Sequence, residues 1–126
     1  MSTNYYAKFQ PNGEDDITLT LHIGKSSRGR ISTLCGTYFP NRRAWADFLR
    51  HNDARTLTIV DEYGVEYTAE AFIADYLATP DTNQRKWLID NGYTIHGVDD
   101  AETLRPRSGD YWVDEDGFLL YDGMFF

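Results

Sequence analysis

The side chains best suited to chemistry gather in one short stretch, where an alternating hydrophobic segment gives way to cations and hydroxyls. They are His22, Gly24, Lys25, Ser26, Ser27, Arg28 and Arg30. Backbone amides around a glycine, together with cationic and hydroxyl side chains, form sites for phosphate and other small anions. Residues 24–30 therefore predict an anion-binding turn, with His22 beside it as a general base or an anion partner. A solvated hairpin turn explains the same residues without a ligand, because short motifs often match by accident.

Two familiar kinds of phosphate chemistry do not fit this stretch. A nucleotide-hydrolysing phosphate loop needs a glycine five residues before Gly24, but Leu19 occupies that position inside a strand pattern. A two-histidine phosphoesterase needs a serine or threonine two residues after each histidine. His22 is followed there by glycine, and His96 by valine. We therefore expect no catalytic residues, and a phosphoesterase is the least favoured function.

Acidic residues form clusters at residues 14–16, 61–62, 99–102 and 110–116. The last cluster lies in an expected hairpin turn, and it provides the candidate partner surface: Asp110, Asp114, Glu115 and Asp116. We expect that turn to tolerate neutralisation without unfolding. Ordinary turn chemistry is an alternative explanation, because aspartate favours turns for local reasons.

The composition predicts one soluble domain with an acidic surface. The chain has 126 residues, which predicts a single α+β domain over residues 1–126. Hydrophobic residues make up 41% and aromatic residues 15%, enough to form a core. The net charge of −8 repels nucleic acid and anionic lipid and attracts basic surfaces. No leader pattern or long apolar run is seen, so we expect a cytoplasmic protein without a membrane or nucleic-acid partner.

Hydrophobic alternation and turn residues predict several strands, most of them joined as hairpins. The expected strands cover residues 5–9, 17–23, 31–39, 57–60, 65–67 and 93–96, and a last hairpin covers residues 111–121. Gly64 stands at the positive-φ position of the hairpin between the fourth and fifth strands. Residues 98–109 are polar and contain Pro106, which indicates a loop.

Three short helices are predicted from capping residues and apolar spacing. Asn41 caps the first helix and Thr68 the second, while the third begins at Thr79 and Pro80 and stops at Asn91. The helix residues expected in the core are Trp45, Phe48, Leu49, Phe72, Ile73 and Leu77. Because hairpins outnumber crossovers, the predicted fold class is α+β. It has a mainly antiparallel sheet and two or three short helices in a single compact domain.

Four motifs stand in order along the chain. They are TNYY at residues 3–6, LHIGKSS at 21–27, IVDEYG at 59–64 and an aromatic end at 116–126. Together they resemble a family of small, uncharacterised bacteriophage proteins with the pattern TNYY, LHIGKSS and IVDEYG. The resemblance implies a phage accessory protein acting in the host cytoplasm, and it implies no reaction. Many such relatives carry a Cys-x-x-Cys pair between the first two motifs, but this chain has no cysteine there.

Two function classes follow from these observations. The leading hypothesis is a non-enzymatic phage protein that binds a host protein or protein–nucleic-acid complex and inhibits it, for example a component of a defence system. The alternative is a protein that sequesters a small anion or nucleotide at residues 24–30. A homo-oligomer is compatible with both hypotheses.

Purified protein is expected to contain no stoichiometric zinc. Cys35 is the single cysteine, and it combines with three scattered histidines in no known ligand spacing, so we also expect no cofactor. Elemental analysis of protein purified without chelator measures this directly, and one zinc per chain would contradict the expectation.

Overall fold

Strand β1 (Thr3–Phe9) lies inside the sheet and organises its first half. It pairs antiparallel with β2 (Leu19–Ser27) on one side and with β4 (Leu57–Asp61) on the other. The computed structural model describes residues 2–10, 18–27, 30–52, 57–96 and 111–123. The predicted hairpin of the first two strands is confirmed, although its 11–16 loop lies outside the described residues.

The strands of the described chain form one sheet in the order β5-β4-β1-β2-β3-β8-β7-β6. The remaining strands are β3 (Arg30–Cys35), β5 (Glu66–Tyr67), β6 (Ile95–His96), β7 (Tyr111–Val113) and β8 (Leu119–Tyr121). All neighbours pair antiparallel except β3 with β8 and β6 with β7. The predicted α+β class with a mainly antiparallel sheet is therefore confirmed.

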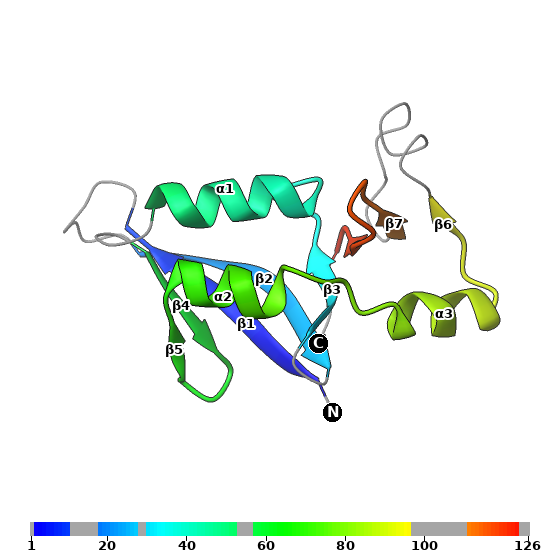
Figure 1. Ribbon diagram of the computed structural model, residues 1–126, viewed down its shortest axis with the longest axis horizontal. Helices are drawn as coiled ribbons and strands as arrows, with labels where there is room; N and C mark the ends of the chain where they lie inside the picture. The colour runs from blue at the N-terminus through cyan, green and yellow to red at the C-terminus, as the bar shows by residue number, and fades with distance from the viewer. Residues whose placement is uncertain (1, 11–17, 28–29, 53–56, 97–110, 124–126) are drawn as a thin grey trace.

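Within the described ranges, three helices accompany the sheet: α1 (Arg42–Asn52), α2 (Ala69–Tyr76) and α3 (Asn83–Asp90). Asn41 Oδ1 accepts the Ala44 amide at the start of α1, and Thr68 Oγ1 accepts the Ala71 amide at the start of α2. Both predicted caps are confirmed. In Figure 1, α1 and α2 accompany β1, β2 and β4, whereas α3 lies at the other end near β6.

The main core fills the space between the sheet and the first two helices. It contains Trp45 and Leu49 of α1 and Phe72 of α2, all fully buried. Strand β8 is covered on both faces, because consecutive Leu119 and Leu120 are buried and successive strand residues point to opposite faces. Leu120 belongs to the main core, whereas Leu119 is buried outside it, as is Leu88 of α3. We infer that α3 covers the second face of the sheet at this end, where it contacts β3 and β6.

Several predicted boundaries and one core position differ from the structure. Strand β3 stops at Cys35 instead of continuing to residue 39. The third helix begins at Asn83, because the Asp81 amide donates to Ile31 O of β3 and the Asp81 carboxylate accepts the Asn83 amide. Phe48 is only partly buried, while the other five predicted core residues of the helices are buried. The expected 98–109 loop lies outside the described residues.

Phe72→Ala is expected to lower the free energy of unfolding by about 3–5 kcal/mol, because removing a fully buried ring leaves a large cavity. The ring of Phe72 packs against Tyr5 and Tyr76, each at a centroid distance of 5.2 Å. Urea denaturation measures the loss. Phe48→Ala is the comparison and should cost less, because that ring is partly exposed. Equal losses of unfolding free energy in the two variants would contradict the difference in burial between Phe72 and Phe48.

Candidate functional site

Residues 24–27 of the segment predicted as an anion-binding turn belong to strand β2. Strand β2 runs through Ser27, so its side chains alternate between the two faces of the sheet. Ser26 is buried on the face that packs against α2, where its Oγ lies 2.9 Å from the Tyr5 hydroxyl. Lys25 pairs with Asn4 and with Thr33 in the ladders, on the opposite face. The side chains of Lys25 and Ser26, both members of the predicted set, therefore lie on opposite faces of the sheet and cannot bind the same anion.

The other members of the predicted set do not restore such a site. Gly24 lies so close to β3 that a Cβ atom there would be 2.4 Å from Thr33 O, so this glycine serves strand packing. Arg30 is exposed at the start of β3. Arg28 and the side chain of Ser27 lie outside the description.

His22 belongs to a polar chain that joins β2, β1 and the turn after β4. Its Nε2 lies 2.9 Å from Asn4 Oδ1. Asn4 in turn donates to Glu62 Oε1, from its backbone amide at 2.7 Å and from Nδ2 at 3.3 Å. A carboxylate only accepts hydrogen bonds, so Asn4 Nδ2 must face Glu62, Oδ1 faces His22, and His22 Nε2–H donates. Residues of the TNYY, LHIGKSS and IVDEYG motifs thus meet at one place.

The surroundings of His22 favour a neutral, positioned imidazole. Burial lowers its pKa, a backbone hydrogen bond at Gly24 acts in the opposite direction, and the positive charge of Lys25 lowers it further. The ring stacks on Tyr6 at a centroid distance of 5.0 Å. Its Nε2 contacts the side-chain amide of Asn4. The side chain of His96 is not described.

A cleft of about 360 Å³ lies where β2 and β3 approach the beginning of α3. Its lining residues are Ser2, Lys25, Ser32, Asp81, Asn83, Gln84 and Trp87. Lys25 is half-buried, and burial lowers the pKa of its ammonium group. Only Lys25 is shared with the predicted anion site, and His22 does not line the cleft.

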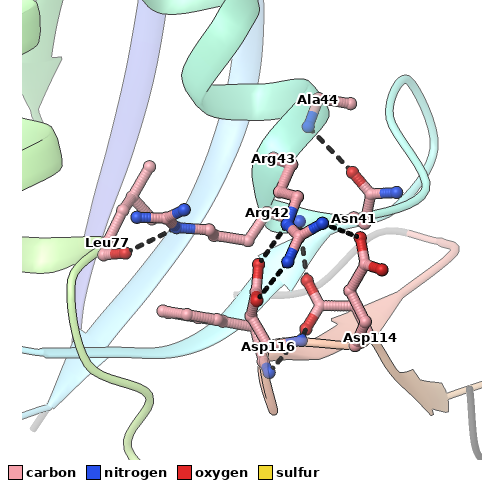
Figure 2. A network of polar contacts seen from close by, with 9 residues as sticks. Asn41, Arg42, Arg43, Ala44, Leu77, Asp114 and Asp116 are labelled. Atoms are coloured by element: carbon pink, nitrogen blue, oxygen red, sulfur yellow. Dashed lines mark hydrogen bonds and ion pairs between the residues drawn. The ribbon is translucent and has the colours of Figure 1, made fainter.

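The predicted partner surface on the last hairpin is largely used inside the protein. Asp114 is buried, and its Oδ2 accepts the Arg42 amide at 2.7 Å, as Figure 2 shows. Its Oδ1 accepts the amides of Asp116 and Phe118 at 3.0 and 2.8 Å. These contacts argue against neutralising Asp114, because asparagine would present an amide group to one of these N–H donors, whereas tolerance at Glu115 and Asp116 stays a prediction.

The two following carboxylates are paired with one guanidinium. Arg43 Nε and Nη2 donate to the two oxygens of Asp116 at 3.1 and 3.2 Å (Figure 2). Its Nη1 lies 3.2 Å from Glu115 Oε1. The hydrogen bonds and charges of these partners raise the pKa of Arg43. Asp110 lies outside the described residues. This turn consequently offers little unpaired negative charge to a partner.

The hairpin between β4 and β5 repeats the same turn. Asp61 Oδ1 accepts the amides of Tyr63 and Val65 at 2.9 and 3.0 Å, just as Asp114 binds the amides two and four residues ahead. Gly64 and Gly117 both have φ of 87°, which suits glycine. The second Asp61 oxygen accepts the Tyr67 hydroxyl at 3.0 Å. The hydrogen bonds to buried Asp61 therefore fix the shape of this turn.

Side chains at the tip of this hairpin are exposed and apolar. Tyr63 is 68% exposed and Val65 is 51% exposed. Glu62, Glu66 and Glu70 are exposed on the turn and on the elements that follow it. Arg50 lies 3.7 Å from Glu70, a loose and solvent-exposed ion pair. We call residues 62–66 the hairpin tip, and it combines an aromatic side chain with acidic neighbours.

Sequence reasoning missed the α3 side of the cleft and the Asn4–Glu62 contact. Both depend on segments far apart in the chain, so no local pattern connects them. The proximity of the TNYY and IVDEYG motifs follows only once β1 is paired with β4. The sequence did contain one indication of the cleft. Leu88 takes the buried position on α3, so its neighbour Trp87 points to a different side of the helix and is exposed.

The chain matches no protein-family model, no curated protein and no solved structure. In the described parts of the chain, no group of three or more His, Cys, Asp or Glu side chains could hold a metal ion. None of the described helices is long and apolar enough to cross a membrane.

Asp61 is expected to make stability depend on acid pH. Burial tends to raise its pKa, but hydrogen bonds from Val65, Tyr63 and Tyr67 outweigh burial and hold it below its ordinary value of 3.8. A carboxyl with a lowered folded-state pKa stabilises the protein above its unfolded pKa, and that contribution is lost as pH falls through the folded value. The free energy of unfolding should therefore decline below about pH 4.

Urea denaturation between pH 3 and pH 7, read by circular dichroism, measures this dependence. Asp61→Asn should be less stable than the parent at neutral pH and should show a shallower decline in acid. Asp75→Asn is the matched control, because Asp75 is exposed on α2. An unchanged acid slope in Asp61→Asn would contradict the assignment.

Proposed function

We propose that this chain is a phage accessory protein that acts in the host cytoplasm without catalysis. It binds a host protein or protein–nucleic-acid complex through the hairpin tip and inhibits it, a defence-system component being the favoured target. The observation that carries the proposal is the exposure of Tyr63 and Val65 on a turn fixed by buried Asp61.

The hairpin tip has the features of an interface anchor. Large aromatic side chains provide much of the binding energy in protein interfaces, and tyrosine is among the most frequent of them. Binding costs less when the contact residues are already ordered. Two side-chain hydrogen bonds to Asp61, together with the backbone bond from the Gly64 amide to Asp61 O, hold this tip in one shape.

Charge indicates the chemistry of the partner surface. The chain has a net charge of −8, and exposed glutamates surround Tyr63 at the hairpin tip. A surface bearing lysine and arginine complements this arrangement, and its cations also interact favourably with the tyrosine ring. Long-range attraction between such surfaces speeds association at low salt.

The environment of His22 supports binding over catalysis. Its ring is held between the Asn4 side chain and Tyr6, and its Nε2–H points to an amide oxygen. Such an arrangement fixes the ends of β1, β2 and β4 relative to one another. This polar chain therefore supports the position of the hairpin tip, because Glu62 is part of the polar chain and of the tip.

The test uses a set of bacterial strains, each carrying one defence system, CRISPR–Cas included. The strain whose defence system is the target should regain sensitivity to phage when it expresses the chain. Tyr63→Ala should remove this effect, because loss of an anchoring tyrosine weakens binding about thirtyfold at 2 kcal/mol. Plaque counts on matched lawns measure the outcome. Tyr38→Ala is the control, because Tyr38 is also exposed, at 53%, but lies outside the hairpin tip.

The same variants can be compared with the purified target. Association should slow as salt is added, while dissociation changes less, because screening acts on the encounter. Glu66→Gln, which leaves the contact between Asn4 and Glu62 in place, should slow association at low salt. An interface at the hairpin tip would be contradicted if Tyr63→Ala still restored sensitivity to phage as the parent does. It would also be contradicted if Tyr38→Ala lost this effect to the same extent as Tyr63→Ala.

A further inference from the structure

We propose that the cleft between β2, β3 and α3 is a binding site for a free mononucleotide. The base stacks on Trp87, its edge contacts Asn83 and Gln84, and its phosphate binds Lys25. This site is separate from the hairpin tip, so the proposal does not depend on the proposed function.

Trp87 provides the stacking surface. It is 53% exposed at the edge of the cleft, whereas Trp45 and Trp112 are buried. The indole lies against Tyr93, with ring centroids 6.2 Å apart and planes inclined by 31°. An exposed tryptophan supported by a second aromatic ring suits a planar base, because every nucleobase has a face that stacks on aromatic side chains.

Asn83 and Gln84 lie on the same side of α3 as Trp87. They precede it by four and three residues, the spacing that places side chains next to one another on a helix. Each amide side chain donates and accepts hydrogen bonds at the same time. The edge of a nucleobase offers the same alternation, and paired contacts of asparagine or glutamine with adenine use it.

Lys25 provides the charge for the phosphate. It is half-buried and lines the cleft, and burial lowers the pKa of its ammonium group. Asp81 already accepts the Asn83 amide, and a carboxylate in this position also suits a ribose hydroxyl.

Size and charge favour a free nucleotide over a nucleic-acid strand. The cleft volume of about 360 Å³ falls at the lower end of the range of small-molecule sites. A protein with a net charge of −8 repels a polyanion, whose binding requires several cations along the backbone. A mononucleotide carries about two negative charges, far fewer than a strand, and Lys25 offsets part of that charge.

Nitrogen–proton correlation spectra of the full chain during titration with AMP, GMP, CMP or UMP test the proposal. The indole N–H groups of Trp45 and Trp112 donate to Cys35 O and Pro40 O, each at 2.8 Å. Their signals should stay in place. The Trp87 indole signal and the side-chain amides of Asn83 and Gln84 should move with at least one of the four nucleotides.

Variants and partial ligands separate the contributions. Lys25→Ala should weaken nucleotide binding about tenfold and leave the matching nucleoside unaffected. Trp87→Ala should weaken both by about tenfold, the value expected for a lost stacking contact. Lys8→Ala is the control, because Lys8 is exposed on β1 and does not line the cleft.

The outcomes distinguish the alternatives. An unmoved Trp87 signal at millimolar concentrations of all four nucleotides would overturn the site. Equal binding of inorganic phosphate alone would reduce it to an anion contact and overturn the nucleotide proposal. Tighter binding of a single-stranded oligonucleotide than of its mononucleotide would overturn the choice of a free ligand.

Discussion

One buried carboxylate joins the two halves of the molecule. Asp114 lies in the hairpin of β7 and β8, yet one of its oxygens accepts the first amide of α1. A helix N-terminus has unsatisfied N–H groups and a partial positive charge, so a carboxylate in this place is strongly favoured. Arg42 extends the connection, because its Nε donates to Leu77 O just after α2 (Figure 2). Asp114 and Arg42 together therefore connect the last hairpin with the start of α1 and the end of α2.

The two Asp-Glu-x-Gly turns show how one local structure serves two purposes. In both, the first aspartate binds the amides two and four residues ahead, and glycine adopts a positive φ. The two turns differ in the partner of the second carboxylate oxygen of that aspartate. Asp114 directs it to α1 and makes its turn part of the interior, while Asp61 directs it to Tyr67 and leaves the turn projecting into solvent. The acidic residues that follow are accordingly bound to Arg43 in one turn and exposed in the other.

Local chemistry made most of the fold predictable from the sequence. The caps at Asn41 and Thr68, the glycine turns and the alternating strands all depend on residues within a few positions of one another. Predictions failed where distant segments decide the outcome. Strand β2 continues through Lys25 and Ser26 because β1 and β3 pair with it on both sides, which no local pattern reveals. The delayed start of α3 depends on contact with β3, and the cleft needs residues from both ends of that contact.

The parallel pairing of β3 with β8 has a kinetic consequence. Leu34 and Cys35 pair with Leu120 and Tyr121, which lie near the opposite end of the chain. Closing such a long loop costs entropy before any contact compensates it, so contacts of this kind form late. Among the first five strands, three pairs join neighbours in sequence, and the pairing of β1 with β4 closes a shorter loop than that of β3 with β8, so this part can assemble beforehand. We expect capture of the last hairpin to be the slow step of folding, with the unpaired edge of β3 available to neighbouring chains until it occurs.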